Sequence, residues 1–550
     1  MRKNRVVKSM SADKINVRRK ENKKSSKNPT QILVGLICVV LFCLVGLISF
    51  LIFTDRLSLA STEPEIIQNA AGKIIRVPKG GNLQTAINLA GGGDIIELQA
   101  GATYGEIVLP KKNFTDFVTI RSSAFEQLPE NARIEPSKSN LFAKIVSRGG
   151  KGAVETQNGA HHFRFVGIEF ASSGKDYVYN LIYLGTESDS AADVPHDFEF
   201  DRCYFHSSKE NVTRRGIALN GRNATIKNSY FEGFAFSGEE TQAICGWTGT
   251  KNARILNNYI EGGAENIMFG GGEPPNAEMI PQDIIISGNH FNKPPEWKGK
   301  VSMKCLFELK NAKRVEFTEN YLENNWIGSA LRLTLRSEDG KAPFNTIEDV
   351  VIKNNVINGA GEGINILGKD DYYSGKPDSA KGQTLKRLTI TNNLFLNIGG
   401  GQFEGSGYFV QVSDGEQITI SKNTSFNNGN IATFHGTLPR NLVFRDNIIA
   451  HGEYGIHGLE NVKSPAAQKF FQNNVFVNNK NVDVAYASFP PNNFLVGSIQ
   501  QIGFISPNDF RLNSQSKLKG KASDGKNIGS DLTFDAAKKS ILLTTDQTKK

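Results

Sequence analysis

The chain has 550 residues and a formal net charge of +9, yet the excess charge is confined to its beginning. Residues 1–30 contain eleven Lys or Arg and two Asp or Glu, and the rest of the chain carries equal numbers of cations and acids. A neutral body argues against nucleic acid as a partner, because binding to a phosphate backbone requires a basic surface.

Residues 32–53 form an uncharged apolar run of 22 residues, ILVGLICVVLFCLVGLISFLIF. As a helix the run would be about 33 Å long, which is enough to cross a bilayer core. A cleavable signal peptide is the alternative, but its apolar region would be only about 7–15 residues long. The basic flank should stay in the cytoplasm. We therefore expect a disordered cytoplasmic tail (1–31), one transmembrane helix (32–53), a linker (54–74) and a body held at the cell membrane, in the periplasm or outside the cell.

The body begins with NLQTAINLAGGGDIIEL, residues 82–98. Leu83, Ala86, Ile87 and Ala90 fall on one face of a helix, and glycines and a strand pattern follow. A short amphipathic helix at this place would cover the open end of a repetitive structure, as terminal caps do.

Ten short runs with alternating apolar and polar residues follow, which is typical of strands with one buried face. Each run contains one equivalent position, which is Cys or Ser in the first two runs and Asn in the others. It recurs every 24–38 residues, at Cys203, Ser229, Asn258, Asn289, Asn320, Asn355, Asn393, Asn423, Asn447 and Asn474. Repeats of this length indicate a solenoid. We expect the recurring Asn to lie at a bend, where its amide bonds its equivalents in adjacent coils and tolerates left-handed backbone.

A second strand series lies between these runs and includes ENIMFGG, LFELKN and LRLTLRS. Two or more strands per repeat, without room for crossover helices, predict a right-handed parallel β-helix. The predicted fold class is all-β, a solenoid of about 10–12 coils over residues 75–533, with a cap helix before it and a polar tail (534–550) after it.

These features resemble the pectate-lyase-like superfamily of right-handed β-helix proteins, through GGGDIIEL after the cap helix, the repeated IxxNxF pattern and the ending FRLNSQS…DGKNIGSDL. GAHHFRFVGIEF, QAICGW and ENIMFGG are also similar to motifs of uncharacterised bacterial β-helix proteins. The resemblance implies the fold, and that fold hosts lyases, hydrolases, esterases and noncatalytic adhesins.

Stacking the second strand series predicts columns of outward side chains. One column would contain Met268, Glu308, Thr334, Gln411 and Thr433, the next Gly270, Lys310, Arg336, Ser413 and His435, and Arg332 would lie beside Leu306 and Asn266. Two stacked cations need a balancing anion, which would be Glu308, Glu265 or a ligand. An arginine beside a lysine favours the neutral amine, which is a usable base, and guanidinium binds carboxylates. This arrangement suits β-elimination in a uronate polysaccharide.

The spacing also resembles the β-helix alginate and dermatan lyases, in which a lysine is followed one coil later by LTLR. Here FELKN contains Lys310 and LTLRS contains Arg336. The resemblance implies that Lys310 is the catalytic base and Arg336 neutralises the carboxylate. Those lyases place acidic calcium ligands just before the lysine, where this chain reads VSMKCLFELK. Calcium is therefore the candidate cofactor, with Glu265 and Glu308 as candidate metal ligands that do not match the motif by spacing.

The candidate substrate-binding residues are Glu308, Arg332, Trp247, Trp326, Gln411 and His435. Two further pairs are weaker candidates. His161 and His162 are adjacent in a strand, so they should point to opposite faces and not share a metal. Asp370 and Asp371 could support glycoside hydrolysis, but a polar loop is the better interpretation.

We expect a membrane-anchored β-helix that acts on polysaccharide as a lyase. The alternative is a noncatalytic carbohydrate-binding or envelope-structural solenoid, in which Lys310, Glu308 and Arg336 form a solvated ion-pair ladder. The expected partners are the membrane and a polysaccharide, and the expected oligomeric state is a monomer.

Overall fold

The computed structural model describes residues 62–69, 72–338, 340–370, 383–463, 465–482 and 489–535. The chain divides into two units, Met1–Ala60 and Ser61–Lys550, and the described residues all belong to the second. The expected cytoplasmic tail, the expected transmembrane helix and Asp371 lie outside the described residues. None of the helices in the described ranges is long and apolar enough to span a membrane.

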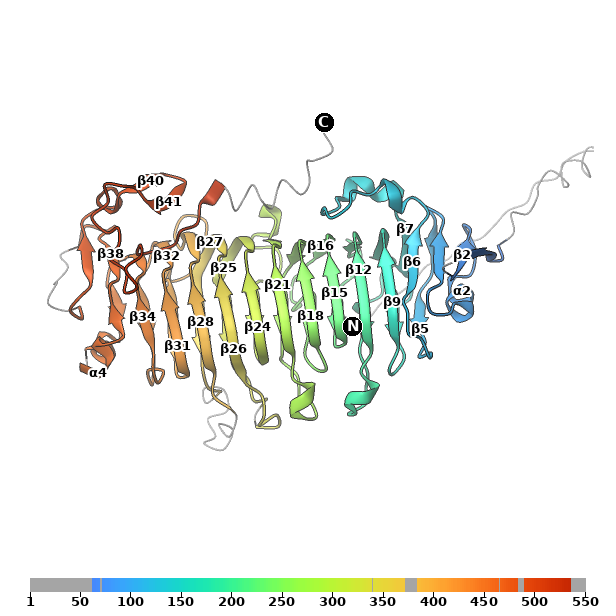
Figure 1. Cartoon of the computed structure of the whole chain (residues 1–550), viewed down its shortest axis with the longest axis horizontal. Coiled ribbons are helices and arrows are strands. Elements are labelled where there is room, and N and C mark those ends of the chain that lie inside the picture. Colours follow the sequence, from blue (N-terminus) through green and yellow to red (C-terminus); the bar gives the residue numbers. More distant parts are fainter. Residues whose placement is uncertain are drawn as a thin grey trace, which may run out of the picture. The chain divides into compact units, whose positions relative to one another are not determined.

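The body is a parallel β-helix, in which each coil contributes strands to three faces (Figure 1). Strands of successive coils pair in parallel, as in β12–β15 and β18–β21. Within the described residues the first face is a 15-stranded sheet, and the other two faces form one 24-stranded sheet. They are continuous because β25 (Tyr321–Thr334) and β27 (Val356–Leu367) run from the second face into the third.

The first face consists of β1 (Glu65–Asn69), β2 (Gly72–Val77), β3 (Ile95–Leu98), β6 (Val118–Ser122), β9 (His161–Val166), β12 (His196–Asp201), β15 (Arg222–Lys227), β18 (Lys251–Leu256), β21 (Gln282–Ser287), β24 (Ala312–Thr318), β26 (Ile347–Lys353), β28 (Lys386–Thr391), β31 (Glu416–Ser421), β34 (Val443–Arg445) and β37 (Phe471–Gln472). The second face consists of β4 (Thr103–Tyr104), β7 (Ala143–Ser147), β10 (Ile168–Ser172), β13 (Tyr204–His206), β16 (Tyr230–Phe234), β19 (Tyr259–Gly262), β22 (His290–Asn292), the first parts of β25 and β27, β29 (Leu394–Ile398), β32 (Thr424–Asn427), β35 (Ile448–Ala450), β38 (Val475–Val477) and β39 (Phe494–Val496). The third face consists of β5 (Ile107–Leu109), β8 (Val154–Thr156), β11 (Val178–Leu184), β14 (Thr213–Leu219), β17 (Gln242–Gly246), β20 (Glu265–Phe269), β23 (Cys305–Leu309), the last parts of β25 and β27, β30 (Val410–Ser413), β33 (Ala432–Phe434) and β36 (Ile456–His457).

Within the described residues the helical segments are short and lie at the ends and in the turns between coils. They are α2 (Leu83–Leu89), α3 (Leu459–Val462), α4 (Pro465–Gln468) and the 3₁₀ turns η1 (Phe125–Gln127), η2 (Pro136–Leu141), η3 (Ala191–Asp193), η4 (Ala277–Met279), η5 (Pro295–Trp297) and η8 (Ile499–Ile502). A separate hairpin of β40 (Phe504–Ser506) and β41 (Asp509–Leu512) follows the last coil.

The recurring polar residue forms a buried hydrogen-bond ladder at the bend between the first and second faces. The backbone N and side-chain Nδ2 of Asn320 donate to Oδ1 of Asn355 at 2.9 and 3.1 Å, and Nδ2 also donates to the Ile286 carbonyl. The predicted ladder is therefore confirmed. The left-handed backbone belongs instead to the residue before it, as at Glu319 (φ +58°) and Asn354 (φ +59°).

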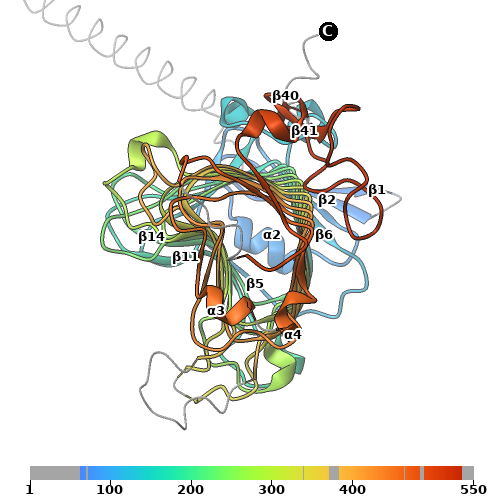
Figure 2. The same ribbon diagram turned by 90° about the vertical axis from the view of Figure 1, so that its left-hand side faces the viewer.

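The N-terminal end of the solenoid is covered. Helix α2 closes the first coil (Figure 2), and its predicted inner face is confirmed because Leu83, Ala86 and Ile87 are buried. The ammonium of Lys112 donates to three carbonyls at the end of α2 at 2.8–2.9 Å. Strand β1 pairs antiparallel with β2, so part of the expected linker at 54–74 belongs to the folded body.

The segment after β39 folds back over the bend that carries the Asn ladder. Ser530 N donates to Thr424 Oγ1, and Asp531 N donates to Asn392 Oδ1, both at 2.9 Å. This segment therefore covers polar groups at the edge of several coils, which a parallel ladder by itself would leave to solvent.

Candidate functional site

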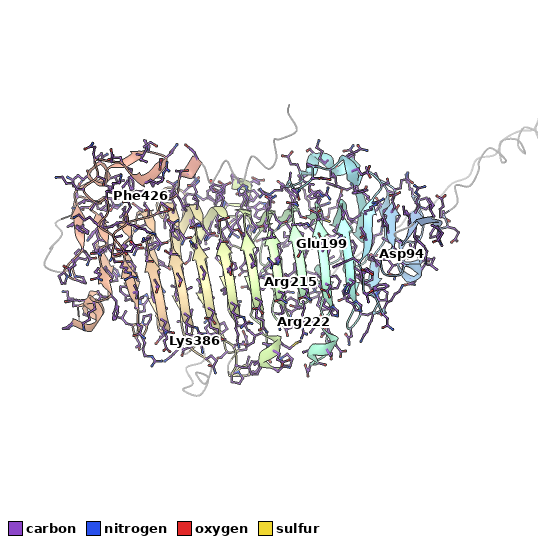
Figure 3. All side chains as sticks on the ribbon, in the orientation of Figure 1. Asp94, Glu199, Arg215, Arg222, Lys386 and Phe426 are labelled. Atoms are coloured by element: carbon purple, nitrogen blue, oxygen red, sulfur yellow. The ribbon has the colours of Figure 1, made fainter. Side chains whose placement is uncertain are left out.

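A cleft of about 940 Å³ lies on the third face and crosses β11, β14, β17 and β20. Its lining includes two aromatic side chains that could contact a sugar ring, Tyr179, which is 62% exposed, and Trp247. The guanidinium of Arg215 lies 4.7 Å from the centre of the Trp247 ring, a cation–π contact that orients the indole. Figure 3 marks the position of Arg215 in the solenoid. Aromatic rings beside charged groups are typical of a site for a polar ligand with apolar faces.

Lys310 borders this cleft. It follows β23, and its side chain runs along Gly271, a lining residue with φ +77°. A Cβ at Gly271 would lie only 3.0 Å from Lys310 Cδ, so any larger residue there would push the lysine away. The lysine side chain therefore fills the space beside Gly271.

The predicted columns are wrong for the third-face part of β25, whose register on β23 differs by two residues from the expected one. Glu308 pairs with Arg332, and Leu309 pairs with Leu333, so Thr334 does not stand opposite Glu308 and Arg332 does not lie beside Leu306. The cause is the turn between β23 and the third-face part of β25, whose length the sequence pattern cannot give. Arg332 therefore takes the place beside Glu308 on the outward face.

Lys310 and Arg336 are nonetheless neighbours on adjacent coils. The backbone N of Arg336 donates to the Lys310 carbonyl at 3.0 Å, although the strand register alone would place Arg336 farther along. The chain is thus irregular after Leu333. This irregularity brings Arg336 beside Lys310. The two residues were expected to be neighbours, although the register from which this was expected is wrong.

Arg336 has an acidic partner. Its Nη1 lies 3.2 Å from Oδ1 of Asp370, and the other oxygen of Asp370 accepts from Ser337 N at 2.6 Å and Ser337 Oγ at 3.0 Å. Asp370 is 8% exposed, so it is a fixed partner of the strand end rather than a free acid in a polar loop. The sequence analysis missed this pair because Asp370 comes from the next coil.

Glu338 adds a second acid beside the two cations. Burial raises the pKa of Glu338, Lys310 and Arg336 lower it, and Asp370 and Glu273 raise it, with a net upward shift. Glu273 and Glu338 also line the cleft. One group of charged side chains thus lies at the cleft and contains Lys310, Arg336, Asp370, Glu338 and Glu273.

A second charged cluster lies beneath Arg332. Glu265 and Glu308 are buried, and the ammonium of Lys304 lies 2.9 Å from Glu265 and 3.4 Å from Glu308. Burial raises the pKa of Glu265, although Lys304 opposes the shift. Burial also acts to raise the pKa of Glu308, but Lys304, Lys310, a hydrogen bond from Glu265 and Arg332 together lower it. The pKa values of the two buried carboxyls are therefore shifted in opposite directions, upward for Glu265 and downward for Glu308.

Three of the candidate substrate-binding residues lie elsewhere. Trp326 is wrong as a sugar platform, because it is 4% exposed, stacks on Phe403 at 5.1 Å and donates its ring N–H to the Lys293 carbonyl. Gln411 and His435 lie on later coils and do not line the cleft. Of the predicted set, the structure brings together Lys310, Arg336, Glu308, Arg332 and Trp247.

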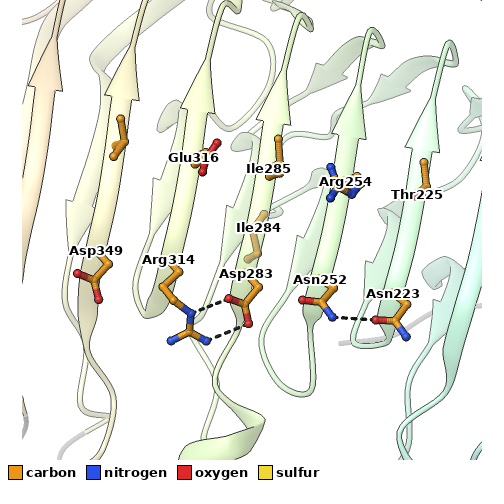
Figure 4. Close-up of a pocket in the computed structure, with 11 residues that line it drawn as sticks. Asn223, Thr225, Asn252, Arg254, Asp283, Ile284, Ile285, Arg314, Glu316 and Asp349 are labelled. Atoms are coloured by element: carbon orange, nitrogen blue, oxygen red, sulfur yellow. Dashed lines mark hydrogen bonds and ion pairs between the residues drawn. The ribbon is translucent and has the colours of Figure 1, made fainter.

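A shallow groove of about 720 Å³ crosses the first face, and four of its polar side chains pair with one another (Figure 4). Arg314 donates to both oxygens of Asp283 at 2.6 and 2.9 Å, and Asn252 donates to Asn223 at 2.9 Å. A flat sheet covered by paired side chains presents little to a ligand, so we place the candidate site in the third-face cleft.

No protein-family model matches the chain, and no curated protein matches it. Among solved structures, the chain is similar to the PL6 family alginate lyase AlyGC, with 15% identity and a TM-score of 0.52 over 84% of this chain and 58% of that one. This chain therefore spans less than two thirds of the length of that lyase. It has the same right-handed parallel β-helix fold.

Two further solved structures are similar at lower scores. One is a mannuronic acid specific polysaccharide family 6 lyase from human gut microbiota, with 15% identity and a TM-score of 0.36 over 73% of this chain and 91% of that one. The other is PfbA, a surface protein and adhesin of Streptococcus pneumoniae, with 12% identity and a TM-score of 0.37 over 75% and 95%. The expected resemblance to pectate-lyase-like β-helix proteins is confirmed for the fold.

Proposed function

We propose that this protein is a membrane-anchored, extracytoplasmic β-helix that acts on a uronate-containing polysaccharide. The observation that supports the proposal most is the position of Lys310 and Arg336 at a cleft lined by Trp247. An indole can stack on the apolar face of a sugar, and a guanidinium can bind a uronate carboxylate through two hydrogen bonds.

The proposed reaction is β-elimination. Arg336 binds the uronate carboxylate, which stabilises the negative charge that develops next to C5. The amine of Lys310 takes the C5 proton, the C4–O bond breaks, and its electron pair leaves on the departing sugar oxygen, which takes a proton from solvent. The product carries a double bond between C4 and C5. The Asp370 carboxylate would have to yield its place on Arg336 to the substrate, or share it.

Glu265 and Glu308 do not fit a resident calcium ion. Calcium takes about six to eight oxygen ligands, whereas these two carboxylates are buried around the ammonium of Lys304, with the Cys305 thiol beside them. The proposed elimination therefore uses side chains alone. We expect the activity to survive treatment with a calcium chelator.

The test is a screen of uronate polymers for the near-ultraviolet absorbance of the unsaturated product. Replacing Lys310 by Ala should lower the rate by about 10²–10⁴-fold, the usual contribution of a general base. The matched control is Lys353→Ala, which removes an exposed lysine from the first face. Activity that persists in Lys310→Ala would overturn the assignment of the base.

The second candidate function is noncatalytic binding of the same class of glycan. The ion pair between Arg336 and Asp370 favours it, because a paired guanidinium is less available to a substrate carboxylate. In that case glycan binding would be measurable by calorimetry, without any unsaturated product from any polymer. Asp370→Asn should then strengthen binding of acidic glycans, since it removes a negative charge beside Arg336.

The anchor is proposed from residues 32–53 alone. A full-length protein that stays in the membrane fraction after an alkaline wash, and a variant without residues 1–53 that does not, would support it. A full-length protein released by the wash would contradict it.

A further inference from the structure

Four polar side chains meet where strands β9 and β12 begin on the first face. β9 starts with His161 and His162, and β12 starts with His196 and Asp197. The strand register pairs His161 with His196, and their rings stack at 4.7 Å with an angle of 2° between their planes. Two adjacent coils thus place imidazoles directly against each other.

The expectation that His161 and His162 point to opposite faces is wrong. His162 has φ +60° and Asp197 has φ +59°, so the second residue of each strand is in left-handed backbone. Side chains alternate between faces only in extended backbone, and the left-handed residue breaks that alternation. Nδ1 of His161 consequently lies 2.7 Å from Nδ1 of His162.

One nitrogen from each of His161, His162 and His196 lies within 4.8 Å of the others, and all three residues are partly exposed. Three imidazole nitrogens converging on one point are the commonest ligand set for zinc with an open coordination position. The rings can bind an ion from solvent, because 22% of the His162 side chain and 36% of the His196 side chain are exposed.

The surroundings of the three rings orient them. Oδ2 of Asp197 lies 2.5 Å from Nδ1 of His196 and 3.8 Å from Nδ1 of His162. Asn223 of the next coil donates to the other oxygen of Asp197 at 3.0 Å, so the carboxylate itself is held. A carboxylate hydrogen-bonded to a histidine is a frequent partner of metal-binding imidazoles. The ring centre of Phe114 lies 6.1 Å from that of His161, and the ring centre of Phe117 lies 5.2 Å from that of His162.

We propose that His161, His162 and His196 bind one divalent transition-metal ion of the zinc class, with Asp197 as orienting residue or fourth ligand. Imidazole nitrogens select zinc, cobalt, nickel or copper over calcium and magnesium, which prefer oxygen ligands. The ion would join two coils on the first face, on a different sheet from the third-face cleft, so its role is to fasten the coils and not to take part in the elimination.

The test is a titration of the full-length protein, without a polyhistidine tag, with Zn²⁺ by calorimetry and with Co²⁺ by visible absorption. One ion per chain should bind, and Co²⁺ should give the visible bands of a low-symmetry site with nitrogen ligands. His161→Ala and His196→Ala should each weaken binding by more than about 100-fold, and Asp197→Asn by about 10–100-fold. His457→Ala, which removes an exposed histidine of the third face, should change nothing.

A second readout covers the case in which a histidine variant folds poorly. Zn²⁺ should raise the Tm of the wild-type protein, and this rise should shrink in Asp197→Asn, which keeps all three imidazoles. Wild-type protein that binds Zn²⁺ no more tightly than His196→Ala would overturn the proposal. So would a Zn²⁺-dependent rise in Tm that is equal in wild type and Asp197→Asn.

Discussion

Lys304 shows how one side chain can decide the chemistry of a site. Its ammonium lies between two buried carboxylates, and a lone charge in that position would be costly to bury. The ammonium offsets the negative charge of the carboxylates around it, so the cluster costs less to bury than any of its charges alone. The sequence marks Glu308 as an outward acid in a strand, but it cannot show that Lys304 turns back to meet it, because that contact depends on the turn before β23.

Glu261 on the second face provides a prediction about pH. Burial raises its pKa to about 7, and a hydrogen bond from Tyr259 and one from Gly233 N only partly oppose the shift. In the unfolded chain a glutamate has a pKa of about 4.3. The contribution of this group to stability is therefore fully present below about pH 4 and is lost as the pH rises through about 7, by roughly 4 kcal/mol in all.

Glu261→Gln should remove this dependence, because the amide keeps the shape and has no proton to lose. Denaturant unfolding at several values between about pH 4 and pH 8 would measure the difference. Glu316→Gln, which changes an exposed acid of the first face, should follow the wild-type curve. Parallel curves for the wild-type and Glu261→Gln proteins would show that Glu261 ionises in the folded state at its ordinary pH.

At the scale of the element, the Asn ladder holds the bend of each coil from Asn258 to Asn474 in place. Asn355→Ala should lower the free energy of unfolding by about 2–4 kcal/mol, because the backbone N of Asn320 and the Phe317 carbonyl both lose a buried partner. Asn354→Gly is the matched control one residue earlier. It should cost far less, since glycine adopts the φ of +59° found there. Equal losses in the two variants would contradict the ladder as the source of stability.

The strands themselves were predictable from alternation, and their register was not. In LRLTLRS the inward pair could be Leu331 with Leu333, or Leu333 with Leu335, because the alternation fits both choices. All three leucines are buried. A shift of two residues keeps every side chain on its face. The structure selects the register that places Arg332 beside Glu308, and an irregularity after Leu333 then returns Arg336 to Lys310.

At the scale of the whole molecule, the β-helix is a stack in which the strands of each coil pair only with strands of the adjacent coils. Ile87→Asp places a charge on the buried face of α2, where the side chain has no exposed surface, and should open the first coils. Hydrogen exchange should then rise in β2, β3 and β6 and remain unchanged in β31 and β34. Leu89→Asp, on the exposed side of the same helix, is the control. A uniform rise along the solenoid would show that the body unfolds as one unit.

The sequence by itself determined the β-helix, the cap helix, the Asn ladder and the candidates Lys310 and Arg336, because these follow from local periodicity and from residues that recur once per coil. Only the tertiary structure decided the register of β23 on β25, the Asp370 partner of Arg336, the enclosure of Lys304 and the meeting of three histidines. The physical reason is common to all four. Each depends on the length of a turn between coils or on a single residue in left-handed backbone. Turn length and left-handed residues leave no pattern in the alternation of apolar and polar side chains.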